Sequence, residues 1–177
     1  MPVDLYHLYS YYTDHSNVLR YIETCKDDNF YQLMRKEFTL DIDSSDIFFC
    51  VETGECFSYK DDAYQILKNE YTFIKLPNRN YLKDMKEFIM ISQNPVMLSL
   101  LNISTPYDFG MSFGQCLDEL DIEGIWLEYL YLKGKYELAK WLDDNNIEWT
   151  DNYAETPIDT HIDFTVEIKK RLEASNI

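Results

Sequence analysis

Apolar side chains recur at helical spacing along most of the chain, and this pattern predicts a mostly helical protein. An apolar residue at every third or fourth position places one stripe of a helix against a core. Asn94-Pro95 and Thr105-Pro106 each combine an N-cap residue with a proline in the first turn, which marks a helix start. The segments expected to be helical are the stretch around Leu5 to Tyr12, a second helix capped by Ser16, a short turn at 30–34, and residues 82–89, 95–101, 106–120, 125–144 and 164–174.

Two β-prone runs, 47–51 and 55–59, flank Glu52-Thr53-Gly54 and predict a β-hairpin. Glycine suits a turn position that needs a positive φ. Residues 71–76 form a third candidate strand, which ends at Pro77. The sequence therefore predicts a small antiparallel sheet around the 47–59 hairpin.

A three-residue hairpin loop would pair Phe49 with Phe57 and would gather the apolar residues on one face of the sheet. The same register would set Cys50 opposite Cys56. In a reducing cytosol two facing cysteines are expected to remain free thiols. We therefore expect this register without a disulfide.

The predicted fold class is α+β, mostly helical, with one small antiparallel sheet. The length of 177 residues is that of a single domain. Within it we expect residues 1–45 to form an N-terminal helical extension, 46–149 a core, and 150–177 a linker with a C-terminal helix.

The segment 125–144 has the most regular pattern and carries the predicted core of the C-terminal half. With Trp126, its expected core side consists of Leu127, Leu130, Tyr131, Leu138, Trp141 and Leu142, and its expected solvent side of Lys133, Lys135, Glu137 and Lys140.

Two glycines, Gly110 and Gly114, stand four residues apart in the segment before it. Side chains four apart lie on the same side of a helix, so this spacing leaves a smooth strip where another backbone can approach closely.

The charge of the chain is strongly negative, −16 from 32 acidic and 16 basic residues. This balance disfavours direct contact with nucleic acid or with an anionic membrane surface, since both are bound through Lys and Arg. Two interpretations stay open. Surface charge most often serves solubility, but an acidic face can also meet a basic partner, including as a mimic of nucleic acid.

Cysteine usage and the N-terminal residues predict a cytoplasmic protein. Four scattered cysteines without a Cys-x-x-Cys pair are typical of reduced thiols. Met1 to Leu5 lack the basic and apolar regions of a signal peptide, and no apolar run approaches the length of a membrane span.

Several short motifs resemble a known bacterial family. They are the run Phe49-Cys50-Val51-Glu52-Thr53-Gly54-Glu55, the strand ending at Leu76-Pro77, and a helix around Met85 to Ile89. Further along come Phe113 and Leu117, Trp126 with Tyr129, Ala139-Lys140-Trp141-Leu142 and Asn145-Asn146-Ile147.

Over roughly residues 46–149 these motifs resemble uncharacterised protein family zero-one-five-eight. They are structural: a Thr-Gly hairpin turn and aromatic core positions. The chain lacks the family's Gly-Arg/Lys-rich entry to the central helix. Because the family has no established activity, the resemblance implies a fold and leaves function open.

No catalytic or metal-binding motif stands out. The three histidines have no zinc-ligand spacing, Cys116 lies on an apparent core face, and there is no Gly-x-Ser-x-Gly elbow or phosphate loop. Asp41, Asp43, Ser45 and Glu52 match calcium-loop positions, but Asp46 occupies the position that requires glycine. We expect no cofactor and no metal.

We therefore expect a non-catalytic acidic protein that binds another protein, and the negative charge favours a basic partner. A specific version is a phage-type inhibitor or immunity-like partner of a nucleic-acid-acting enzyme. The alternative is an enzyme or metal-binding protein whose site assembles from residues remote in sequence. The densest acidic patch supplies the candidate contact, and Tyr129 would be its aromatic anchor if it faces outward: Asp118, Glu119, Asp121, Glu123 and Tyr129.

Overall fold

The structure is a computed structural model and describes residues 1–12, 46–152 and 157–177. The helical turns expected before Leu40 lie outside the described residues. So do three of the calcium-loop positions, Asp41, Asp43 and Ser45.

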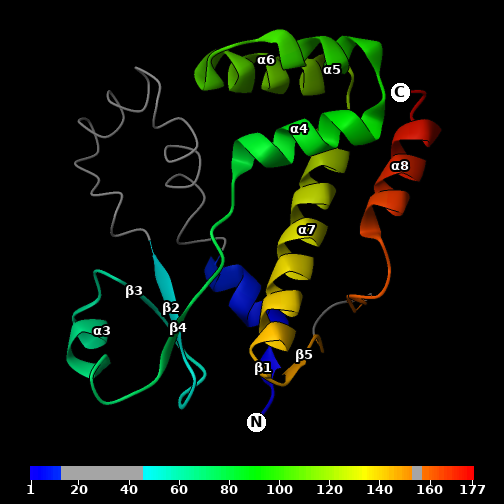
Figure 1. The fold of residues 1–177 in the computed structure, drawn as a ribbon. Helices are drawn as coiled ribbons and strands as arrows, with labels where there is room; N and C mark the ends of the chain where they lie inside the picture. Colours follow the sequence, from blue (N-terminus) through cyan, green and yellow to red (C-terminus); the bar gives the residue numbers. More distant parts are fainter. Residues whose placement is uncertain (13–45, 153–156) are drawn as a thin grey trace.

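The fold is α+β and mostly helical, as the sequence predicts (Figure 1). Residues 5–12 are helical. The longer helices agree with the predicted segments to within a few residues, because capping residues such as Asn94 and Thr105 accept backbone hydrogen bonds from the first turn. The other helices are α3 (Asp62–Leu67), α4 (Tyr81–Ser92), α5 (Pro95–Ser99), the 3₁₀ turn η2 (Leu100–Asn102), α6 (Pro106–Glu119), α7 (Glu123–Asp144) and α8 (Phe164–Ala174).

Three strands form an antiparallel sheet in the order β3-β2-β4, from β2 (Ile47–Cys50), β3 (Cys56–Ser58) and β4 (Phe73–Lys75). The hairpin and the third strand are thus confirmed. The helix α3 lies between β3 and β4 and was not predicted, since six residues are too few to show a clear helical period.

The predicted hairpin register is wrong by one residue. Phe49 pairs with Cys56 rather than with Phe57, and Cys50 N donates to Glu55 O at 2.9 Å. The turn is longer than expected: Gly54, at φ 74°, donates to Cys50 O at 2.9 Å. Cys50 and Cys56 therefore point to opposite faces of the sheet, because adjacent pairs alternate between faces.

The register differs because both faces of this sheet are apolar. On one face Phe48 stacks on Tyr64 of α3, with ring centroids 4.7 Å apart. On the other face Phe49 packs edge-on against Trp141 of α7 at 5.9 Å. The prediction assumed that only one face of the sheet packs against apolar side chains. Because both faces do, either register places apolar residues against an apolar neighbour.

A second sheet joins the N-terminus to the end of α7. The strand β1 (Val3–Asp4) runs parallel to β5 (Trp149–Thr150), and Val3 N donates to Glu148 O at 2.8 Å. Nearby, Tyr12 OH donates to Pro77 O at 2.8 Å. These contacts bring the N-terminal helix against α7 and the strand end of β4.

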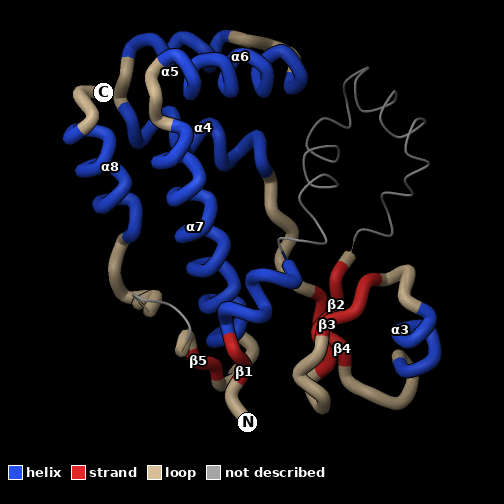
Figure 2. The backbone as a smooth tube through the Cα atoms, turned by 180° about the vertical axis from the view of Figure 1, so that it is seen from behind, coloured by secondary structure: helices blue, strands red, loops and turns tan. Residues whose placement is uncertain are grey.

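The helices form two packed groups that share α7 (Figures 1 and 2). At one end of α7, the helices α4, α5, α6 and α8 enclose a core with fully buried Phe88 and Tyr129. At the other end, the N-terminal helix and the sheet enclose a second core with Leu138 and Leu142. None of the helices in the described ranges has the length and apolarity needed to cross a bilayer.

The predicted core of α7 is partly correct. Leu138 and Leu142 are buried, but Leu127 is 56% exposed. Lys133 and Lys135, expected on the solvent side, are buried at 7% and 1% exposure.

Candidate functional site

The four predicted acidic residues lie around the junction of α6 and α7, and all four are exposed. The chain reverses here because Asp121 takes a positive φ of 55° and Ile122 N donates to Leu117 O at 3.0 Å. The fully buried Ile122 anchors this turn. The carboxylates of Asp118, Glu119, Asp121 and Glu123 consequently surround an anchored loop.

Tyr129 does not face outward, so its predicted role as an exposed anchor is wrong. Its side chain is fully buried and stacks on Trp126 with ring centroids 5.5 Å apart. Tyr129 stands three positions after Trp126, so both side chains lie on the core side of α7. Burial, followed by nearby Glu87 and Asp84, raises the pKa of Tyr129 above its ordinary value.

A groove of about 480 Å³ opens beside the acidic junction. Its base is apolar, since Met85, Phe113 and Trp126 are nearly buried, while Leu127 stands exposed at its side. We call this feature the acid-rimmed groove. Its lining comes from α4 (Tyr81, Met85), α6 (Gly110, Phe113, Gly114, Leu117, Asp118) and α7 (Glu123, Trp126, Leu127).

The groove includes two of the four predicted acids. Asp118 contributes from α6 and Glu123 from α7, whereas Glu119 and Asp121 are not among its lining residues. Glu119 instead accepts a hydrogen bond from Gln115 Nε2 at 2.8 Å.

The glycine strip on α6 keeps the groove open. Gly110 and Gly114 both line it, and a Cβ placed on Gly114 would have no neighbour within 4 Å. At Gly114, therefore, the side chains of the described residues leave the helix backbone uncovered.

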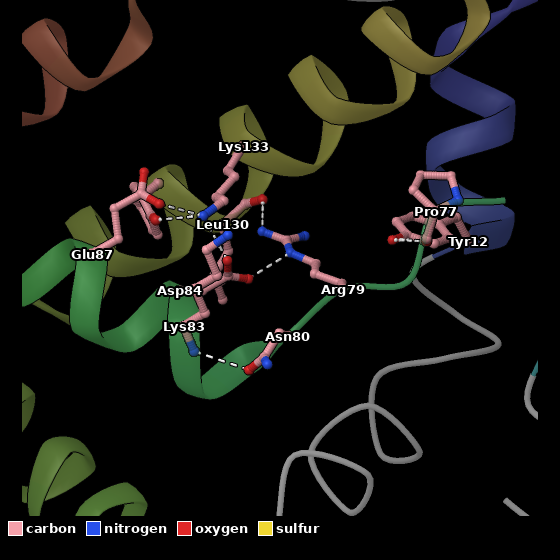
Figure 3. Close-up of polar contacts among 10 residues, drawn as sticks. Tyr12, Pro77, Arg79, Asn80, Lys83, Asp84, Glu87, Leu130 and Lys133 are labelled. Carbon is pink, nitrogen blue, oxygen red and sulfur yellow. Dashed lines mark hydrogen bonds and ion pairs between the residues drawn. The ribbon is translucent and has the colours of Figure 1, made fainter. Parts of the chain in front are cut away.

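A buried ion network holds two of the groove's walls together (Figure 3). Asp84 of α4 accepts from Arg79 Nε at 2.8 Å and pairs with Lys133 Nζ of α7 at 2.8 Å. Lys133 Nζ also lies 2.6 Å from Glu87 Oε2. Arg79 Nη2 donates to the backbone oxygen of Leu130 at 2.6 Å. The network fixes α4 against α7.

The ion pairs of this network keep Arg79 and Lys133 in their charged forms. Burial alone would lower the pKa values of Arg79 and Lys133, but nearby carboxylates outweigh it and raise both: Asp84 first for each, with Glu87 adding to the effect on Lys133. Glu137, half-buried nearby, has no such direct ion pair with the residues that the structure describes. Burial and then Asp84 raise the pKa of its carboxyl.

A second buried pair joins α7 to the segment after β5. Lys135 Nζ lies 2.5 Å from Asp151 Oδ2, and both side chains are almost completely buried. Asp151 Oδ2 also accepts from Ile158 N at 3.0 Å. The pair therefore holds the chain after Thr150 against the helix.

Sequence reasoning missed the buried lysines because it assigned every lysine of α7 to solvent. One signal was present for Lys133. It stands four residues after Tyr129 and seven after Trp126, which puts it on their stripe of the helix.

A larger cleft, of about 900 Å³, separates the N-terminal helix from β3 and α3. It gathers residues remote in sequence, among them His7, Tyr11, Cys56 and Asp61. Burial raises the pKa of the Cys56 thiol to about 12, and burial followed by Asp61 raises that of Tyr11 to about 12. At neutral pH both groups therefore stay protonated.

Within the described ranges, no group of three or more His, Cys, Asp or Glu side chains is arranged to hold a metal ion. Glu52, the last calcium-loop position, accepts from Thr72 N through both carboxylate oxygens, at 2.9 and 3.0 Å. Cys116 is buried in the core around α6, and burial followed by Glu119 raises its pKa.

Comparisons with family models, with curated proteins and with solved structures find no match to this chain.

Proposed function

We propose that this chain is a non-catalytic protein that binds a basic protein partner through the acid-rimmed groove. The observation that carries the proposal is an apolar groove floor next to exposed carboxylates. Asp118 and Glu123 flank the floor from two helices, and the ten lining residues, all within the described chain, include no Lys or Arg.

Such a surface can supply both the apolar contact and the charged rim of a protein interface. Covering the exposed Leu127 would provide affinity, because apolar area removed from water is the main favourable term in association, while the nearly buried floor shapes the contact. The acids at the rim would steer a basic partner toward the groove and would disfavour acidic ones.

The specific version of the proposal is an inhibitor or immunity-like partner of a nucleic-acid-acting enzyme. Enzymes of that class present Lys and Arg to phosphates, and carboxylates can occupy the same positions. The net charge of −16 supports this version. We propose a cytoplasmic location, which suits the free thiols Cys50, Cys56 and Cys116. Membership of uncharacterised protein family zero-one-five-eight remains a proposal about residues 46–149.

Identification of what co-purifies with the untagged chain tests the proposal. We expect mass spectrometry to find one basic protein at stoichiometric amount. The variant Asp118→Lys/Glu123→Lys should lose this partner. A control, Glu70→Lys/Glu148→Lys, makes the same change in net charge at exposed positions away from the groove and should keep it.

A bound metal or small cofactor without a protein partner would instead favour the alternative of a site assembled from remote residues. Loss of the partner in both variants would show that net charge, rather than the acid-rimmed groove, determines binding.

A further inference from the structure

The lining of the acid-rimmed groove includes one row of residues four apart on α6 and another on α7. On α6 the stripe consists of Gly110, Gly114 and Asp118, each four residues from the next. On α7 it consists of Glu123 and Leu127, again four apart. Rows of residues four apart are the ridges and grooves by which helices pack on one another.

We infer that the groove binds one amphipathic α-helix of the partner. This inference rests on the proposed function and names the kind of partner segment that the groove accepts. In this mode of recognition, a helix lays its apolar face into an apolar groove and presents anchors at positions i, i+3, i+4 and i+7.

The apolar requirement follows from the floor and from Leu127. Leu127 is a large apolar side chain that is 56% exposed, and beside it the nearly buried Met85, Phe113 and Trp126 give the groove an apolar floor. An apolar stripe on the bound helix would cover these side chains together.

The helical shape is favoured by the glycine strip. Glycine in a helix interior costs about 1 kcal/mol relative to alanine, and α6 contains two. Gly114 has open space where its side chain would be, so neither core packing nor a positive φ requires glycine there. Close approach of a second helix would use that space, as small residues permit backbones to come together.

The position of the two carboxylates determines which end of the groove the basic end of the bound helix occupies. Asp118 ends the α6 stripe and Glu123 begins the α7 stripe, so both carboxylates lie at the junction end of the groove. Basic side chains are therefore expected at one end of the bound helix, with its apolar stripe running away from them.

The test uses a synthetic helical peptide with leucines along one stripe and lysines at one end. A scrambled peptide of the same composition provides the charge control. Affinities for both are measured by isothermal titration calorimetry. We expect one peptide to bind per chain, with the scrambled peptide at least about tenfold weaker.

Two matched variants locate the site. Gly114→Leu would fill the groove, whereas Gly124→Leu places the same side chain into open space outside its lining. Both replace a helical glycine by a better helix former, so both should fold, which circular dichroism and the melting temperature check. We expect Gly114→Leu to weaken peptide binding at least about tenfold and Gly124→Leu to leave it unchanged.

Equal binding of the two peptides, or equal binding by the two variants, would overturn the inference. Capture of the natural partner separates this outcome from failure of the proposed function. If Asp118→Lys/Glu123→Lys loses the partner and Gly114→Leu keeps it, the acidic rim binds without a helix in the groove. If both variants keep the partner, the proposed function fails as well.

Discussion

Lys133 Nζ lies 2.8 Å from Asp84 Oδ1, and the two side chains, which come from different helices, are 8% and 3% exposed. Removing two charges from water is costly and is offset only by good geometry and further hydrogen bonds. Here Arg79 donates to the other oxygen of Asp84, and Lys133 also reaches Glu87. The pair therefore positions α4 against α7, and both helices line the acid-rimmed groove.

Replacing Asp84 by Asn should strongly destabilise the protein. The change keeps the shape of the side chain but leaves Arg79 and Lys133 buried without their shared carboxylate. We expect a loss of about 3–5 kcal/mol in the free energy of unfolding, measured by chemical denaturation. Asp144→Asn, at the exposed end of α7, serves as the control and should stay within about 0.5 kcal/mol. Similar values for the two variants would show that the buried network does not stabilise the helix packing.

Two leucines of α7 should respond very differently to truncation. Leu138 is fully buried, so Leu138→Ala leaves a cavity and should cost about 2–5 kcal/mol. Leu127 is 56% exposed, and Leu127→Ala should change the free energy of unfolding by less than about 0.5 kcal/mol. Thermal and chemical unfolding measure both. If Leu127→Ala proves as costly as Leu138→Ala, Leu127 belongs to the core and not to the groove.

Glu137 should make the protein less stable as the pH rises. Its pKa in the folded chain lies above the ordinary 4.5, because burial and then Asp84 disfavour the charged form. Between the two values the folded chain holds a proton that the unfolded chain has lost, so stability falls as pH increases through this window. Glu137→Gln removes the titration. The free energy of unfolding of this variant, relative to that of the wild type, should therefore increase as the pH rises above 4.5 and stay constant below it.

Denaturation at a series of pH values checks this difference. Glu167→Gln, on an exposed position of α8, is the control. A constant difference between Glu137→Gln and the wild type at every pH would contradict a raised pKa at Glu137.

Most of the described helices could be predicted from the sequence because their signals are local. Asn94 and Thr105 cap the first turns of α5 and α6 in the structure, and α8 spans the predicted 164–174. The hairpin register could not be predicted, since it depends on what covers each face of the sheet. Phe48 and Phe49 are adjacent, and both are covered, one by α3 and the other by α7.

The candidate site was predictable only in its acidic part. Asp118 and Glu123 belong to a run of acids at a helix junction, which the sequence displays directly. The apolar floor joins Met85 of α4 to Trp126 of α7, and their contact depends on tertiary packing. For Lys133 the helical spacing places it on the stripe of Tyr129, but its carboxylate partners Asp84 and Glu87 on α4 could not be identified from a local pattern.

The association rate of the co-purified basic partner, measured against salt concentration, tests the central claim most directly. The variant is Asp118→Lys/Glu123→Lys, since Asp121 has a positive φ at which lysine would add strain. The wild-type rate should fall as the screening length shrinks from about 30 Å at 0.01 M to about 10 Å at 0.1 M. At low salt the variant should associate far more slowly with an unchanged melting temperature, while Glu70→Lys/Glu148→Lys keeps most of the wild-type rate. A wild-type association rate for Asp118→Lys/Glu123→Lys at low salt would contradict the account and would leave the acidity of this surface to solubility alone.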